Sequence, residues 1–249
     1  MKHPLRTLLL AVCCGLAAAC TQRQERLKLM SYNIRNGIGI DNIQDIGRIA
    51  RVILREAPDL VALQELDSAT LRVDGRYIPG ELGRMTGMHA TFGRAIGFAG
   101  GSYGIGLLSR TEPLAVRSIP LPGREEARVL LMAEFPDYTV CITHLSLTPE
   151  DRLASLPIIR EATDTCRKPV LLAGDFNTGN AAAVLAGLGG GFRILSDTTR
   201  MTFPSDNPAV RIDYILGRGL PTSATVAESA VDHTATASDH CPLWVTLVW

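Results

Sequence analysis

Apolar and polar residues alternate along the chain with two different periods, and segments of the two kinds follow one another. In residues 41–56, Ile46, Ile49 and Ile53 recur at helical spacing among charged residues, which predicts an amphipathic helix. Further helices are expected over residues 80–86, 148–163 and 181–188. Short apolar runs predict buried strands, and these are residues 27–32, 60–63, 105–109, 129–135, 138–143, 170–173, 210–216 and 242–248.

Proline and glycine modify this pattern at two places. Pro157 lacks an amide proton, so we expect an interruption in the helix of residues 148–163. Residues 97–106 contain five glycines and predict a loop or a tight hairpin before the strand that begins at Ile105.

Strands interleaved with helices, without a long linker, predict a single α/β domain. We expect two β-sheets packed as a sandwich and flanked by helices, in a four-layer α/β/β/α arrangement. The periodicity alone would also allow one doubly wound sheet. A length of 249 residues and a hydrophobic content of 46% suit one domain with a substantial core.

The first residues of the chain have the composition of a targeting segment. Lys2 and Arg6 precede an apolar stretch over residues 8–16, and small residues follow, which is typical of a secretory signal peptide at residues 1–19. The sequence Ala17-Ala18-Ala19-Cys20 resembles a bacterial lipobox, in which a lipidated Cys20 would become the mature N-terminus. Plain cleavage beside a coincidental cysteine is the alternative.

This interpretation divides the chain into a signal peptide, a lipidated tether at residues 20–26 and a single globular domain at residues 27–249. A tri-acylated cysteine carries enough apolar chain for stable anchoring. We therefore expect an exported lipoprotein, anchored to a bacterial membrane at the outer membrane or the periplasmic face. The expected oligomeric state is a monomer.

Six cysteines suggest a disulfide framework only until their positions are considered. Cys13 and Cys14 lie in the signal peptide, and Cys20 would be acylated. The odd remainder leaves at least one free thiol, and no pair has metal-site spacing. No disulfide is therefore predicted among the remaining cysteines, which are Cys141, Cys166 and Cys241.

The charge of the chain bears on its partners. The formal net charge is zero, and lysines and arginines do not gather into runs. Because affinity for nucleic acid comes largely from basic residues that neutralise backbone phosphates, this balance disfavours a tight DNA-binding protein without excluding a local basic cleft.

Six short polar stretches hold the candidate chemistry, and most of them directly follow an apolar, strand-like run. They are Ser31-Tyr32-Asn33, Gln64-Glu65-Leu66-Asp67, Thr143-His144-Leu145, Gly174-Asp175-Phe176-Asn177, Arg211-Ile212-Asp213-Tyr214 and Ser238-Asp239-His240. We expect the fold to bring them to one end of a sheet. Carboxylates and carboxamides from separate strands, together with two histidines, suit a hard metal ion and a phosphate, so the set indicates a metal-dependent phosphoesterase.

The ordered set resembles the endonuclease/exonuclease/phosphatase superfamily, which includes pancreatic-type deoxyribonuclease, abasic-site endonucleases, neutral sphingomyelinases and inositol polyphosphate 5-phosphatases. Each motif alone recurs by chance, whereas six in this order are specific. The resemblance extends from Leu29 to Trp244 and includes two further stretches, residues 104–110 and Glu126 with Arg128.

The predicted metal ligands are Glu65 and Asn33, each placed after a buried strand. Mg²⁺ prefers oxygen ligands and is commonly held by one or two carboxylates. The family uses the matching residues in this way, and Asp239 resembles a family residue near the metal. Strand-end capping or turn formation is the alternative role for Glu65 and Asn33. The expected cofactor is Mg²⁺, with Mn²⁺ as the other candidate.

Asp175 and Asn177 are predicted to act on the attacking water and the phosphate. Two residues apart in an extended segment, their side chains would share one face. A carboxylate can align or deprotonate a water for in-line attack, and an amide can donate to a phosphate oxygen without repelling it. The resemblance implies the same roles. An Asx turn after a strand is the alternative interpretation.

The two motif histidines are predicted to contact phosphate. An imidazolium at His240 would neutralise charge and donate a hydrogen bond, and Asp213 resembles the family residue that pairs with this histidine. His144 matches a phosphate-contacting histidine of the deoxyribonuclease and sphingomyelinase branches. A structural histidine is the alternative at both positions. Arg128 is expected either to contact the site or to pair with a core carboxylate, and His89 and His233 are read as structural or surface residues.

Departures from the family pattern bear on the substrate. Arg35 stands where abasic-site endonucleases carry an acidic residue, and no aromatic and basic cluster is present to stack bases. We therefore expect a phosphodiesterase or phosphatase that acts by in-line water attack on an extracytoplasmic lipid, sugar or small-molecule phosphoester. A secreted nuclease with the same active site is the alternative, and a non-catalytic binding lipoprotein is a minor one.

Overall fold

The computed structural model describes residues 25–249. The predicted signal peptide at residues 1–19 and the predicted lipidation of Cys20 lie outside the described residues. Within residues 25–249, none of the helices combines the length and the apolar character needed to cross a membrane.

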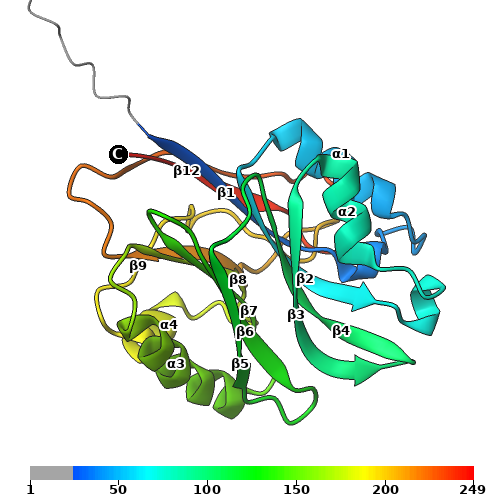
Figure 1. The fold of residues 1–249 in the computed structure, drawn as a ribbon, viewed down its shortest axis with the longest axis horizontal. Coiled ribbons are helices and arrows are strands. Elements are labelled where there is room, and N and C mark those ends of the chain that lie inside the picture. Colours follow the sequence, from blue (N-terminus) through cyan, green and yellow to red (C-terminus); the bar gives the residue numbers. More distant parts are fainter. Residues whose placement is uncertain (1–24) are drawn as a thin grey trace, which may run out of the picture.

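Two six-stranded mixed sheets pack face to face, with two helices on the outer face of each (Figure 1). The first sheet has the order β11 (Thr225–Val231), β12 (Leu243–Val248), β1 (Arg26–Asn33), β2 (Leu60–Ser68), β4 (Gly101–Ser109) and β3 (His89–Phe98). The second sheet has the order β5 (Ala115–Leu121), β6 (Arg128–Glu134), β7 (Thr139–His144), β8 (Val170–Asp175), β10 (Asp213–Arg218) and β9 (Arg193–Ile194). The predicted two-sheet sandwich is confirmed, and the single doubly wound sheet is excluded.

The helices complete the four layers. The first sheet is covered by α1 (Ile46–Glu56) and α2 (Ile78–Thr86), and the second by α3 (Pro149–Asp164) and α4 (Ala181–Leu188). Two short 3₁₀ helices, η1 (Arg35–Gly37) and η2 (Leu71–Val73), lie in the loops that follow β1 and β2. Helix α1 begins later than predicted because Asp45 caps it by accepting a hydrogen bond from the amide of Gly47 at 2.8 Å.

The apolar residues form three layers: one between the sheets and one under each pair of helices. The central strands are therefore buried on both faces, which explains why they are nearly continuous apolar runs in the sequence. Each sheet also contains one parallel pair at its centre, β1 with β2 and β7 with β8. The carboxyl ends of these four strands lie at one end of the sandwich, and the candidate site is at that end.

The strands that the sequence did not predict are β3, β5, β9 and β11. Strands β5 and β11 are exposed along most of their length, and β3 is half-exposed, so none carries an apolar run. Residues 97–106 form the predicted tight hairpin, but its turn is only Ala99 and Gly100, and the remaining residues are strand. A Cβ on Gly104 would lie 2.1 Å from the carbonyl oxygen of Gly93, so this glycine allows two strands to approach closely.

Two further expectations about elements were wrong. Helix α3 is continuous through Pro157. Both Pro157 and Leu153, whose carbonyl would accept the missing hydrogen bond, lie on the exposed face, where water can satisfy that carbonyl. The tether was predicted to end at residue 26, whereas the amide of Glu25 already donates to the carbonyl of Trp249 at 2.9 Å and β1 begins at Arg26.

Candidate active site

The candidate site is the polar end of the layer between the two sheets. In β8, Leu171 and Ala173 face this layer, and the two-residue period of a strand carries Asp175 to the same face. In β7, Ile142 and His144 are related in the same way. The core face of each strand therefore ends in a side chain of the site, and both of these polar side chains are buried.

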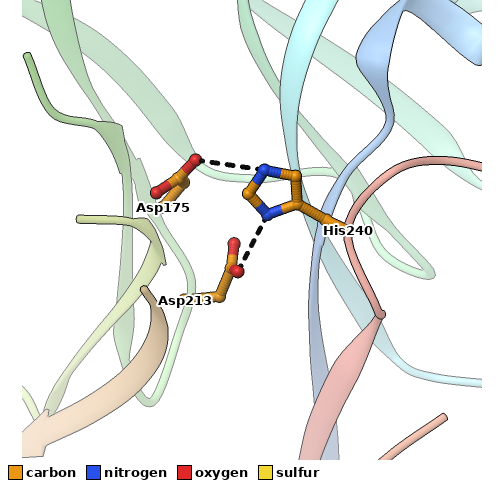
Figure 2. Close-up of side chains that lie close together, drawn as sticks. All are labelled: Asp175, Asp213 and His240. Atoms are coloured by element: carbon orange, nitrogen blue, oxygen red, sulfur yellow. Dashed lines mark hydrogen bonds and ion pairs between the residues drawn. The ribbon is translucent and has the colours of Figure 1, made fainter. Parts of the chain in front are cut away.

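His240 forms a hydrogen-bonded pair with Asp213 (Figure 2). Its Nδ1 lies 2.9 Å from Asp213 Oδ2, and Thr202 Oγ1 donates to the same carboxylate oxygen at 2.6 Å. Burial opposes the charged form of His240, but the carboxylates of Asp213, Asp175 and Asp239 outweigh it and raise the pKa of His240 to about 10. At neutral pH this residue is therefore an imidazolium, as predicted for a phosphate-binding group.

Asp175 uses its two oxygens separately. Oδ1 accepts the amide of Asn177 at 2.8 Å, which is the Asx turn considered as an alternative. Oδ2 faces three nitrogen atoms: Asn33 Nδ2 at 3.2 Å, His144 Nε2 at 3.5 Å and His240 Nε2 at 3.7 Å. Burial, and then the nearby carboxylate of Asp213, raise the pKa of Asp175 to about 7. The turn and a role in the site are thus compatible.

Asn177 does not lie in an extended segment. Its φ is 50°, so the chain leaves the strand after Asp175 and the predicted shared face is not formed. The side-chain Nδ2 donates to the carbonyl of Leu145 at 2.8 Å. This bond ties the loop after β8 to the loop after β7, and it leaves one amide proton of Asn177 for another acceptor.

Glu65 reaches the site through a β-bulge. Strand β2 was predicted to end at Leu63, but it continues to Ser68 with a register shift between Leu63 and Leu66, and Glu65 has a φ of 60°. The bulge turns the carboxylate toward Asn33, whose Nδ2 donates to Glu65 Oε1 at 3.1 Å. The site therefore includes both predicted metal ligands. Asn33 lies at the end of β1 as expected, whereas Glu65 lies in a bulge within β2 and not after the strand.

Asp239 lies at the rim of the site beside Arg35. Their side chains form an ion pair of 3.5 Å and are each about one third exposed. Arg35, which departs from the pattern of abasic-site endonucleases, thus neutralises the carboxylate predicted to lie near the metal.

The donor set near Glu65 fits a hard cation. Glu65 supplies a carboxylate oxygen and Asn33 an amide oxygen that also accepts the amide of Arg35, and both are ligand types that Mg²⁺ prefers. Asp239 adds a carboxylate at the rim, where it is paired with Arg35. Ligand atoms of Asp175, Asp213 and His240 also lie within 4.8 Å of one another. That second group suits a metal less well, because its imidazole is protonated and already donates to Asp213.

Two contacts of the site were not predicted from the sequence. Thr202 donates to Asp213, and Phe203 packs on the ring of His240 with 4.7 Å between ring centroids. Both residues lie in a long loop without a periodic pattern, so only its path in space reveals the contacts. Arg128 contacts the site through His144, and its carboxylate partner is the partly exposed Glu126 and not a core residue.

The remaining described histidines are not among the side chains that contact Asp175, and His233 Nε2 lies 3.0 Å from the carbonyl oxygen of Met201. His89 and His233 are exposed, as expected for surface residues. Cys141 and Cys241 are buried, Cys166 is half-buried, and all three are free thiols.

The sequence profile of the Endonuclease/Exonuclease/phosphatase family matches residues 30–240, a span that includes every residue of the candidate site. The chain belongs to this family. Members of the family are phosphoester hydrolases. Among curated proteins, no sequence matches the chain.

Solved structures of family members share the fold. An endonuclease/exonuclease/phosphatase from Bacteroides vulgatus is 20% identical with a TM-score of 0.72, covering 90% of this chain and 98% of its own. A mannosyl-6-phosphatase from Bacteroides thetaiotaomicron VPI-5482 is 19% identical with a TM-score of 0.71, covering 90% and 100%. TDP2 from D. rerio, complexed with a single-strand DNA product, is 22% identical with a TM-score of 0.67, covering 89% and 98%. At these identities the likeness shows the fold alone.

Proposed function

We propose that this family member is a divalent-metal-dependent phosphoester hydrolase in which Asp175 aligns and deprotonates the attacking water. One observation carries the proposal: a buried carboxylate oxygen of Asp175 faces Asn33, His144 and His240 at 3.2 to 3.7 Å. The raised pKa of Asp175, about 7, makes it a better proton acceptor than an ordinary carboxylate.

The surrounding residues would bind the phosphate and the metal ion. His240, held as an imidazolium by Asp213, would neutralise a phosphate oxygen and donate a hydrogen bond to it. The free amide proton of Asn177 would donate to a second oxygen. A Mg²⁺ or Mn²⁺ ion held by Glu65, Asn33 and Asp239 would, when bound, stabilise charge on the phosphate as a Lewis acid.

The proposed substrate is a lipid, sugar or small-molecule phosphoester outside the cytoplasm. The basic residues support this class, because many are already paired with carboxylates and leave little positive charge to follow a nucleic-acid backbone. The extracytoplasmic location is supported by the signal-like sequence of residues 1–19 and Cys20.

The test is a panel of phosphomonoesters and phosphodiesters assayed with the mature chain. We expect Mg²⁺- or Mn²⁺-dependent hydrolysis that EDTA abolishes. Asp175→Asn should lower kcat by about 10² to 10⁴, the usual contribution of a general base. His89→Gln, at an exposed position in β3, is the control and should keep full activity.

Two outcomes would overturn parts of the proposal. Full activity of Asp175→Asn, in a chain that folds normally, would remove the proposed mechanism. Efficient nicking of plasmid DNA, with activity that falls steeply as salt rises, would replace the small-substrate proposal with a nuclease.

A further inference from the structure

A continuous row of side chains leads from Glu126 through Arg128 and His144 to Asp175. Arg128 Nη1 lies 3.0 Å from Glu126 Oε1 and 3.2 Å from His144 Nδ1. On the other side of the ring, His144 Nε2 lies 3.5 Å from Asp175 Oδ2. Arg128 and His144 are 7% and 8% exposed, so water contributes little to the contact between them.

The chemistry of the guanidinium decides where the proton of His144 lies. A guanidinium carries only N–H donors and stays charged at every relevant pH. The contact from Arg128 Nη1 to His144 Nδ1 is therefore a hydrogen bond in which Nδ1 accepts. A neutral imidazole that accepts at Nδ1 carries its proton on Nε2, and that N–H points toward Asp175.

The two histidines of the site consequently differ in their protonation. Both rings are buried, but the Nδ1 of His240 faces a carboxylate and that of His144 faces a guanidinium. Burial, then the charge of Arg128, and then His240 lower the pKa of His144 well below its ordinary value. His144 is thus neutral under conditions in which His240 is charged.

We propose that Arg128 is a positioning residue that holds His144 in the neutral Nε2–H tautomer, so that His144 serves only as a hydrogen-bond donor. In this form His144 cannot accept a proton from water at Nε2 or ligate a metal through that nitrogen. It can donate to Asp175 or to a phosphate oxygen of the substrate. The donation to phosphate rests on the proposed function, whereas the tautomer does not.

Two acidic residues hold Arg128 in place. Glu126 accepts from its Nη1, and Glu125 lies 3.5 Å from its Nη2. Glu125 also accepts hydrogen bonds from Ser146 Oγ and the amide of Leu147, both at 2.7 Å, which fixes the loop that follows His144. The loop before β6 and the loop after β7 thereby position the guanidinium and the imidazole together.

The direct test is ¹⁵N NMR of the histidine ring nitrogens in the folded protein. In the wild-type protein we expect a protonated Nε2 and an unprotonated Nδ1 at His144, without change between about pH 6 and pH 9. In Arg128→Met the pKa of the His144 ring should rise, because only burial and His240 then lower it, and the ring should lose the fixed tautomer. Arg124→Met is the matched control, because Arg124 lies in the loop before β6, pairs with Asp151 of α3 and has a side chain that is 63% exposed.

Arg128→Met leaves Glu126 without its partner and could fail to fold for that reason alone. The double variant Arg128→Met/Glu126→Gln removes the unpaired charge and keeps the test possible. A wild-type His144 that carries its proton on Nδ1, or ring signals that the loss of Arg128 does not alter, would overturn the proposal.

Kinetics give a second readout. For a phosphoester that the protein hydrolyses, Arg128→Met should lower kcat by about ten-fold or more with a smaller effect on KM. Because the pKa of His144 rises in this variant, an acidic limb of the pH profile should move to higher pH, and Arg128→Lys should restore part of the rate. An expected NMR result without any phosphoesterase activity would refute the proposed function and leave the tautomer assignment standing.

Discussion

Two buried histidines beside one carboxylate hold different numbers of protons, and their immediate partners explain the difference. The Nδ1 of His240 donates to Asp213, which favours the imidazolium, whereas the Nδ1 of His144 accepts from Arg128, which favours the neutral ring. Asp175 lies between the two rings, with one oxygen engaged in a turn and the other facing both. The protonation state of each histidine is therefore set by the residue that contacts its Nδ1.

The pair formed by Asp213 and His240 predicts how stability depends on pH. The pKa of His240 rises from 6.5 to about 10 on folding, so its contribution is fully present below pH 6.5 and is lost as pH rises toward 10. Asp213→Asn should lower the free energy of unfolding by about 3 kcal/mol at pH 6. It should also remove most of the decline in stability between pH 6.5 and pH 10. Urea unfolding at pH 6, 8 and 10 measures both quantities. An equal decline with pH in the variant and the wild-type protein would contradict the prediction.

At the scale of elements, the irregular parts of the strands position the site. The bulge in β2 gives Glu65 a positive φ and turns its carboxylate toward Asn33. The hairpin of β3 and β4 packs beside this strand, and its glycines permit the close approach of neighbouring backbones. The sequence prediction ended the first of these strands at Leu63 and gave residues 97–106 as a loop or a tight hairpin. The usual signals of a strand are absent where a strand bends or lies very close to its neighbour.

Gly104 tests the importance of that close approach. A Cβ at this position would lie 2.1 Å from a backbone oxygen, so Gly104→Ala should separate β3 from β4 and destabilise the protein by about 2 kcal/mol. Gly97→Ala, in the same hairpin, meets only the flexible end of Arg94 and should change stability by less than about 0.5 kcal/mol. Chemical unfolding of both variants compares them directly. Equal stability of the two variants would show that the contact can relax.

At the scale of the whole molecule, positive charge is neutralised locally. Arg48, Arg72, Arg124 and Arg218 each pair with an aspartate, in agreement with the formal net charge of zero. Such a surface offers few free cations to a polyanion, which is consistent with a small phosphoester as the proposed substrate.

The predicted anchoring of the molecule also has a direct test. Expressed with its own N-terminus in a bacterial host, the protein should partition into detergent and carry the added mass of acyl chains, because such chains bind membranes stably. Cys20→Ser should abolish both properties, whereas Cys166→Ser should leave them unchanged. A wild-type protein that remains entirely in the aqueous phase would contradict the lipidation of Cys20.

The sequence by itself determined the order of the functional residues and the alternation of strands and helices in one α/β domain, and it favoured two sheets over one. Central strands buried on both faces are apolar throughout, so the polar residues at their ends stand out, and Asp175, His144 and Asn33 were identifiable for this reason. Edge strands such as β5 and β11 lack this signal, because most of their side chains are exposed and need not be apolar.

Only the tertiary structure decided which residues act on one another. The bulge at Glu65, the bond from Thr202 to Asp213 and the contact of Arg128 with His144 each join positions that no local pattern relates. Protonation depends on burial and on the charges within a few ångströms, and these are fixed only when the two sheets pack. The sequence therefore indicated the chemical groups of the site, and the fold assigned them their partners and protonation states.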